Sequence, residues 1–474
     1  MNKYKNFAIN ILVFFINTVA TKLISFVLIP LYTYYLSTSE YGVTDMSVTV
    51  ITLLFPIASL YLADGMIRFA IDDPDNKEHY LSPSFFVVLI GCAVVGLCLP
   101  LLDLHIFGGL GNYKLLFYIA FVLTSVQTYE ASAARALNQM KIIPLCGTLS
   151  ALGTCASAIL LIAKNRMGVP GYFYSIIFGQ VVGIFMYEIL GKHYRYIKAV
   201  SLKRDGQMLR RMLAYALPLV PDSIFWWMNT SVNRFIITGM LGIAASGLFA
   251  AAQKIPNMLS LMNNVFQEGW SLSAFQEFKN KDIAGFFSLI LKLYQTLAVI
   301  VSSSMMLLSP VLASILLQRD FYAGWVYMPA MILAFYFNAF NIFFGSVFTT
   351  TMKTNYIMFT TVAGACSSLV FTWLLIPHFG LFGAGVALVI SNGLIFVLRA
   401  CISRRLLTFD VNWVVTIAST VLLACQAAIT SLQLPNFMAI GALSLAVICV
   451  LQSVALAPVI NKARLLVRSR HAER

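Results

Sequence analysis

The chain has 474 residues, of which 60% are hydrophobic and only 11% are charged, and its formal net charge is +14. Soluble domains carry about 25% charged residues, so the composition excludes a soluble globular protein and predicts an all-α polytopic membrane protein. The positive charge does not indicate nucleic-acid binding, because Lys and Arg cluster in short loops between apolar runs, as the positive-inside rule describes.

The apolar runs predict about fourteen transmembrane helices, because a membrane span needs roughly 20 apolar residues. Pro218, Pro221 and Pro256 interrupt the seventh and eighth runs. Proline bends a helix, and membrane helices tolerate it where they line a cavity. In chain order the predicted spans are residues 8–33, 43–63, 83–102, 114–134, 142–163, 171–190, 212–238, 243–266, 284–308, 326–350, 356–376, 381–402, 411–431 and 436–458.

Charge orients these spans. The first apolar run follows Lys3 and Lys5, is too long for a signal peptide and has no small-residue cleavage site after it, so we expect a cytoplasmic amino terminus. With that orientation, 24 of the 32 Lys and Arg residues fall in cytoplasmic segments and 4 in outer segments. Both termini are therefore predicted to be cytoplasmic. The longest basic connection, 191–211, is expected to lie near anionic membrane lipids, and a docking site for a partner protein is the alternative.

An internal repeat divides the spans into two halves. Residues 140–185 align with 352–397 at an offset of 212 without gaps, and 36–42 echo 241–247 at an offset of 205. Both offsets superpose spans 1–6 on spans 7–12, which is the pattern of a parallel repeat about an axis along the membrane normal. We therefore predict two pseudo-symmetric six-helix lobes plus two C-terminal helices. The predicted parts are an N-lobe (1–190), a basic cytoplasmic linker (191–211), a C-lobe (212–405) and a last helix pair with a basic cytoplasmic tail (406–474).

The sequence implies no cofactor and no metal. The eight Cys are scattered, without a CxxC motif or a Cys/His cluster, and are expected to be packing residues within helices. No Gly-rich phosphate loop is visible, so ATP is not directly implied.

Several segments resemble a known family. They are "ISFVLIPLYTYYLSTSEYGVTDM" (24–46), "LRRMLAYALPLVPDSIFWWMNTSVNRFIITGMLGIAASGLFAAAQKIPNML" (209–259), "QEGWSLSAFQEF" (267–278) and "LLIPHFGLFGAGVA" (374–387). Together they resemble the bacterial polysaccharide flippases, which export O-antigen and capsule repeat units and belong to the multidrug/oligosaccharidyl-lipid/polysaccharide exporter superfamily.

The resemblance implies twelve core helices, usually followed by two more. It also implies a transporter, not an enzyme, that moves undecaprenyl-diphosphate-linked oligosaccharide from the inner to the outer leaflet of the bacterial cytoplasmic membrane. The chain departs from the family pattern at one position: many members have Asp before the Arg-Phe pair, and here Asn233 precedes Arg234.

Three cations within the predicted spans are candidates for holding the lipid diphosphate. Lys22, Arg234 and Lys254 lie on helices at corresponding places of the two halves. A charge at the bilayer centre usually faces a cavity and serves a function, and Arg and Lys both bind phosphate. The alternative is that these side chains extend to the membrane interface, which we also expect for Lys292. With Asn233 beside it, Arg234 is expected to face water, Asp222 or the substrate's phosphate.

Acidic residues are candidates for ion coupling and gating. Asp222 and Glu130 are the coupling candidates, since a coupling carboxylate must be buried enough to exchange H⁺ or bind Na⁺; a structural partnership with a nearby cation is the alternative for Asp222. Asp64 and Arg68 are four residues apart on one helix face. They predict an ion pair at the cytoplasmic mouth, either purely local or acting as a gate.

The sugar portion requires a polar, uncharged path. Trp226 could stack on sugar rings, and Asn229 and Asn233 lie four residues apart near it. Placement of Trp226 in the interfacial aromatic belt is the alternative.

Other functions remain open at this stage. A peptidoglycan lipid-precursor flippase or a drug/cation antiporter of the same superfamily are the alternatives, although organic-cation export would favour buried acids over buried bases. A membrane glycosyltransferase or polymerase is disfavoured by the short outer loops. Docking of polysaccharide polymerase machinery and the identity of the glycan are left open.

Overall fold

A computed structural model of the chain describes residues 24, 26–73, 77–197, 202–260, 262–263, 283–351 and 353–472. These residues form helices joined by turns, and the described part of the chain contains no strand. The all-α fold class is therefore confirmed.

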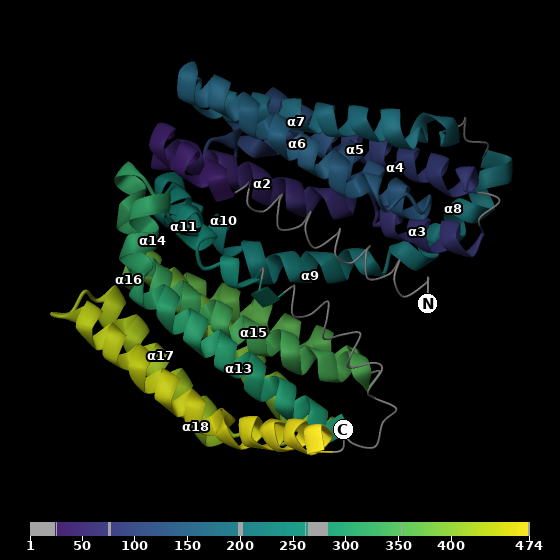
Figure 1. The fold of residues 1–474 in the computed structure, drawn as a ribbon. Helices are drawn as coiled ribbons and strands as arrows, with labels where there is room; N and C mark the ends of the chain where they lie inside the picture. The colour runs from purple at the N-terminus through teal and green to yellow at the C-terminus, as the bar shows by residue number, and fades with distance from the viewer. Residues whose placement is uncertain are drawn as a thin grey trace. The chain divides into compact units, whose positions relative to one another are not determined.

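The chain divides into two compact units, Met1–Leu248 and Phe249–Arg474, each of which is described by itself. In the first unit α4, α5, α6 and α7 pack side by side (Figure 1), and α2, α3 and α8 pack against members of this group. The helices of the first unit are Phe26–Tyr35, α2 (Thr38–Ala58), α3 (Leu62–Asp72), α4 (Glu78–Leu97), α5 (Lys114–Ala136), α6 (Ile142–Ala158), α7 (Gly168–Gly191), α8 (Leu202–Ala216), α9 (Leu219–Ser231), α10 (Asn233–Leu241) and the start of α11 (Ile243–Lys254).

The second unit contains the remaining long helices. Its core is aromatic: Phe287 of α13 and Phe344 of α15 both pack against Phe409, and Phe396 of α16 packs on Phe344. The helices of this unit are the end of α11, α13 (Ile283–Leu307), α14 (Ser309–Leu316), α15 (Met328–Thr350), α16 (Asn355–Leu406), α17 (Trp413–Ser431) and α18 (Phe437–Ala472).

Nine helices within the described ranges are long and apolar enough to cross a membrane. The longest of them, α16, contains two predicted spans, because the backbone at Gly380 leaves the helical region and the two helices meet at this kink. The shorter α9, α10 and α11 occupy the predicted seventh and eighth spans. This is the proline-rich region where the sequence predicts interrupted helices, and Pro218 lies at the cap of α9.

The internal repeat is visible in backbone conformation. Gly168, at the start of α7, and Gly380, in α16, are equivalent at the offset of 212, and both have a positive φ of about the same size, +61° and +56°. Three residues on, a side chain at Gly171 would meet Ile162, and one at Gly383 would meet the carbonyl of Leu375. Both pairs of helices are therefore joined at a glycine with a positive φ, which glycine adopts readily, and approach closely three residues later.

The basic linker includes an amphipathic helix. In α8, Met212 and Ala216 are buried and lie closest to Gly65 of α3, whereas Arg210 and Arg211 are exposed. An apolar face on the protein and a basic face outward are the arrangement expected of a helix beside anionic lipid.

Candidate functional site

Arg234 lies in the first unit and is paired with an acid. Its Nε donates to Oδ2 of Asp45 at 2.5 Å, and the two side chains are 13% and 8% exposed. The arginine comes from the first turn of α10 and the aspartate from α2, 189 residues away in the chain. The sequence predicted water, Asp222 or the substrate phosphate as the partner of Arg234, and it did not predict Asp45. A guanidinium–carboxylate contact is a strong, charge-assisted hydrogen bond, so α10 is fastened to α2 at this point.

Further contacts join the same helices, and we call this line of contacts the α2 seam: Thr38, Gly42, Asp45 and Thr49 of α2 against Trp227, Arg234, Ile243 and Gly247 of α9–α11. One turn beyond Asp45, the indole Nε1 of Trp227 donates to the carbonyl of Thr49 at 3.0 Å. The ring of Phe235 packs edge-on against both Trp227 and Phe107.

Two glycines make the seam tight. A side chain at Gly42 would strike the carbonyl of Ile243, and a side chain at Gly247 would strike the carbonyl of Thr38. The contact is reciprocal, because Thr38 and Ile243 are equivalent at the offset of 205, as are Gly42 and Gly247. Such an exchange of equivalent contacts is the pattern of a two-fold interface. The segments that echo each other in sequence thus pack on each other in space.

The other predicted cations are described in different parts of the chain. Lys22 lies outside the described residues. Lys254 is half-buried at the end of α11 and belongs to the second unit, whereas Arg234 belongs to the first. Lys292 of α13 is 29% exposed and donates to Asp410 at 3.3 Å.

Glu130, a predicted coupling residue, is paired with histidine. Its carboxylate contacts Nδ1 of His193, and both side chains are 1% exposed. The ring's Nε2 lies 2.9 Å from Oε1 of Gln139, whose amide nitrogen donates to the carbonyl of Gly191. Since that amide oxygen can only accept, Nε2 carries a hydrogen, and the Nδ1–carboxylate contact requires a second proton. The pair therefore holds one shared proton.

Asp222, the other predicted coupling residue, lies on α9, and its side chain is outside the described part of the structure.

Asp64 and Arg68, the predicted gate pair, are both exposed on α3. Although the Asp64 side chain is exposed, neighbouring groups partly desolvate its carboxyl and raise its pKa, and the positive charge of Arg135 of α5 offsets part of that rise. Arg135 is therefore a cation that acts on Asp64 from the neighbouring helix, beyond the local pair that spacing predicts.

The predicted sugar contacts differ from one another in exposure. Trp226 is 63% exposed, as an interfacial or stacking residue would be. Asn233 is 1% exposed, and within the described part of the chain neither its amide oxygen nor its nitrogen has a hydrogen-bond partner. Asn229 lies on α9, and its side chain is outside the description.

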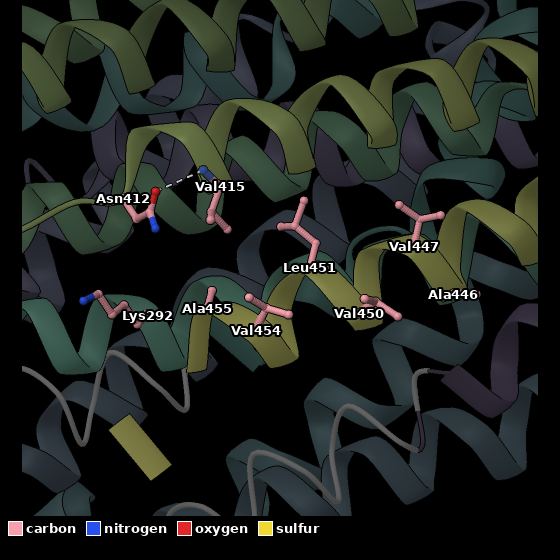
Figure 2. Close-up of a pocket in the computed structure, with 9 residues that line it drawn as sticks. All are labelled: Lys292, Asn412, Val415, Ala446, Val447, Val450, Leu451, Val454 and Ala455. Atoms are coloured by element: carbon pink, nitrogen blue, oxygen red, sulfur yellow. Dashed lines mark hydrogen bonds between the residues drawn. The ribbon is translucent and has the colours of Figure 1, made fainter. Parts of the chain in front are cut away.

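An apolar groove of about 670 Å³ lies in the second unit, between α13, α17 and α18 (Figure 2). Lys292 and Asn412 stand at one end, and valine, leucine and alanine side chains line the rest. Gln452 of α18 fastens these helices, because it bonds both Thr296 of α13 and Ser419 of α17. The lining residues are Lys292, Asn412, Val415, Ala446, Val447, Val450, Leu451, Val454 and Ala455.

Comparison with known proteins assigns the family. The sequence profile of the polysaccharide biosynthesis protein family matches residues 7–269, more than half of the chain. The chain belongs to this family. Among curated proteins, no significant match was found.

Solved structures share the fold. The lipid II flippase MurJ in an inward closed conformation has a TM-score of 0.71 at 12% identity, over 94% of this chain and 99% of that chain. A multidrug resistance MATE family transporter of the MOP superfamily has a TM-score of 0.66 in its inward-facing conformation, at 14% identity, over 82% of this chain and 94% of that chain. An outward-facing conformation gives 0.57 at 14% identity, over 83% and 93%. This member of the polysaccharide biosynthesis family therefore has the fold of multi-pass membrane transporters.

Two residues of the site were missed by sequence analysis. Asp45 lies inside the predicted second span, and an acid in a span is itself a signal of a functional or paired residue. His193 gives no such signal, because it lies in the basic linker, 63 residues from Glu130.

Proposed function

We propose that this protein flips undecaprenyl-diphosphate-linked oligosaccharide repeat units across the bacterial inner membrane by alternating access, for surface polysaccharide biosynthesis. Family membership supports the pathway, and the transporter fold supports the mode of action. The observation that carries the proposal is Arg234: a guanidinium that is 13% exposed and is held by a carboxylate.

The substrate's chemistry matches the available groups. A diphosphate is a compact anion, and a guanidinium binds phosphate oxygens through paired N–H donors, as it binds a carboxylate. Lys22 and Lys254 are the other two residues that we propose as diphosphate ligands. Trp226, Asn229 and Asn233 are proposed to contact sugar. The amide of the buried Asn233, which has no hydrogen-bond partner among the described residues, has donors and an acceptor to offer.

The groove between α13, α17 and α18 suits the hydrocarbon chain of such a lipid. Its lining is apolar apart from Lys292 and Asn412 at one end, and Val450 and Val454 are 64% and 68% exposed. An isoprenoid chain that enters from the bilayer would exchange one apolar surface for another, so it would lie there at little cost.

Energy input is proposed to come from H⁺ or Na⁺. Glu130 is one candidate, since its contact with His193 holds a shared proton, and Asp222 is the other. Asp64 and Arg68 are proposed to act at the cytoplasmic mouth, where Arg135 adds a further positive charge.

The test is transport by purified protein in proteoliposomes. Fluorescent undecaprenyl-diphosphate oligosaccharide is added, and its exposure to a membrane-impermeant quencher is followed over time. Wild-type protein should equalise the two leaflets, and Arg234→Gln should slow this by at least about tenfold, the cost of one charge-assisted hydrogen bond. Asp103→Asn, in an exposed ion pair with Lys114, is the matched control and should flip at the wild-type rate.

A second candidate, flipping of the peptidoglycan precursor lipid II, is favoured by the likeness to MurJ over 94% of the chain. Lipid II is therefore tested in parallel, together with a cationic dye for the antiporter alternative. Faster flipping of lipid II than of oligosaccharide lipids, or dye export that depends on an ion gradient, would overturn the proposal.

A further inference from the structure

Asp45 is the acidic residue of the seam, sequence analysis assigned it no function, and its surroundings are unusual. It is 8% exposed on a predicted membrane helix. The buried phenols of Tyr41 and Tyr172 lie within electrostatic reach of its carboxylate. A carboxylate in such a place is costly without a cation, and the structure supplies Arg234.

The rest of the seam is complementary in shape but contributes few strong interactions. Gly42 and Gly247 allow the backbones to meet, and Trp227 donates one hydrogen bond to a carbonyl. The amide of Asn233, beside Arg234, is buried and unbonded in the described part of the chain. Among the seam contacts that the structure describes, the ion pair is thus the strongest, and the polar side chain of Asn233 lies next to it without a described partner.

Two anions beside one guanidinium repel each other. The structure places Nε of Arg234 on Asp45, and a diphosphate that reaches the other N–H groups of this guanidinium brings further negative charge beside that buried carboxylate. A diphosphate that reaches Arg234 therefore competes with the Asp45 carboxylate.

We propose that Asp45 is the counter-ion that holds the α2 seam closed while no substrate is bound, and that the substrate's diphosphate opens the seam by replacing Asp45 on Arg234. The second half of this inference rests on the proposed function. Asp45 is a positioning residue, because it acts through Arg234.

The test is hydrogen–deuterium exchange of the full chain in lipid nanodiscs, read at residues 38–49 and 233–247. Undecaprenyl diphosphate is the probe, and undecaprenol, which lacks phosphate, is the matched control ligand. Undecaprenyl diphosphate should accelerate exchange in both segments of wild-type protein, and undecaprenol should not. Asp45→Asn should exchange at least about tenfold faster than wild type without any ligand, because the closed seam would hold the guanidinium of Arg234 without this carboxylate.

Three further variants separate a charge effect from misfolding. Asp45→Glu keeps the charge and should exchange slowly. The double variant Asp45→Arg with Arg234→Asp restores the pair in reverse, so it should exchange slowly without ligand. Asp103→Asn, which removes an exposed acid elsewhere, should behave as wild type.

The inference is overturned if Asp45→Asn exchanges as slowly as wild type, or if bound undecaprenyl diphosphate leaves wild-type exchange unchanged. Failure of the proposed function is a different result: undecaprenyl diphosphate would not bind wild-type protein at all, whereas Asp45→Asn would still release the seam. That outcome supports the counter-ion role and removes the diphosphate as the group that opens it.

Discussion

Two arginines, one in each unit and each at most 13% exposed, satisfy their charge in different ways. Arg234 of α10 faces the carboxylate of Asp45 at 2.5 Å. Arg399 of α16, 9% exposed, donates instead to three neutral oxygens: the carbonyl of Asn341 at 2.6 Å and the hydroxyls of Thr360 and Thr361 at 3.0 and 3.1 Å.

The difference distinguishes an arginine that stabilises the fold from an arginine whose anionic partner can be replaced by another anion. The partners of Arg399 come from α15 and from the first half of α16, so this arginine fastens three helical segments through fixed dipoles. An anion that displaced the neutral carbonyl from Arg399 would also disrupt the packing of these segments. The carboxylate at Arg234 is an anion already, and another anion can replace it. We therefore expect Arg399 to support the fold and Arg234 to serve transport.

The largest effect is expected at Arg234. Arg234→Gln removes the cationic partner of the buried Asp45 carboxylate, and breaking a buried ion pair in this way costs about 3–5 kcal/mol of stability. The variant also removes the phosphate ligand. Thermal unfolding in nanodiscs and the flipping assay measure the two effects. Adding Asp45→Asn should restore much of the stability without restoring flipping. Restoration of both would mean that the pair is structural, like Arg399.

Arg399→Gln is expected to lower stability with little effect on transport by folded molecules. Each lost hydrogen bond to a charged group costs about 1.5–3 kcal/mol. The unfolding temperature should fall, and the flipping rate per folded molecule should stay near wild type. A fully stable Arg399→Gln protein that does not flip substrate would contradict the contrast between the two arginines.

Gly247→Ala tests the tightness of the seam. The new methyl group would strike the Thr38 carbonyl, and overpacking of this kind costs about 1–3 kcal/mol. Gly239→Ala in α10 is the matched control, because a methyl group there meets nothing within 4 Å and alanine favours helix. Unfolding temperatures should therefore fall for the first variant and stay level or rise for the second. Equal shifts would argue against a close seam.

The smallest effect is expected at the pair Lys114–Asp103, whose side chains are 35% and 60% exposed. Exposed ion pairs contribute about 0–1 kcal/mol. Asp103→Asn should therefore leave unfolding and flipping within error of wild type. A loss comparable to that of Arg234→Gln would show that burial does not distinguish the two pairs.

Sequence analysis predicts the helices of this protein well, because a span must be apolar throughout its length. The prediction 284–308 corresponds to α13 (Ile283–Leu307), and 114–134 to α5 (Lys114–Ala136). The repeat also aligns Gly168 with Gly380 in sequence. Both positions have a positive φ, a backbone conformation that favours glycine.

The pairing of charges is not predictable in the same way. Arg234 and Asp45 are 189 residues apart, and no local periodicity connects them. The sequence similarity between 36–42 and 241–247 predicts that the two segments are equivalent in the repeat, but it does not predict that they contact each other. That contact depends on Gly42 and Gly247 lying on facing sides of two helices, which only the packed structure defines.

Affinity for undecaprenyl diphosphate tests most directly whether Asp45 and the substrate compete for Arg234. Binding is measured in nanodiscs for wild-type protein, Asp45→Asn and Arg234→Gln, with undecaprenol as the control ligand. Removal of the competing carboxylate should make Asp45→Asn bind more tightly than wild type, and loss of the guanidinium should make Arg234→Gln bind more weakly. Binding by Asp45→Asn that is no tighter than wild type, together with unchanged binding by Arg234→Gln, would contradict this account.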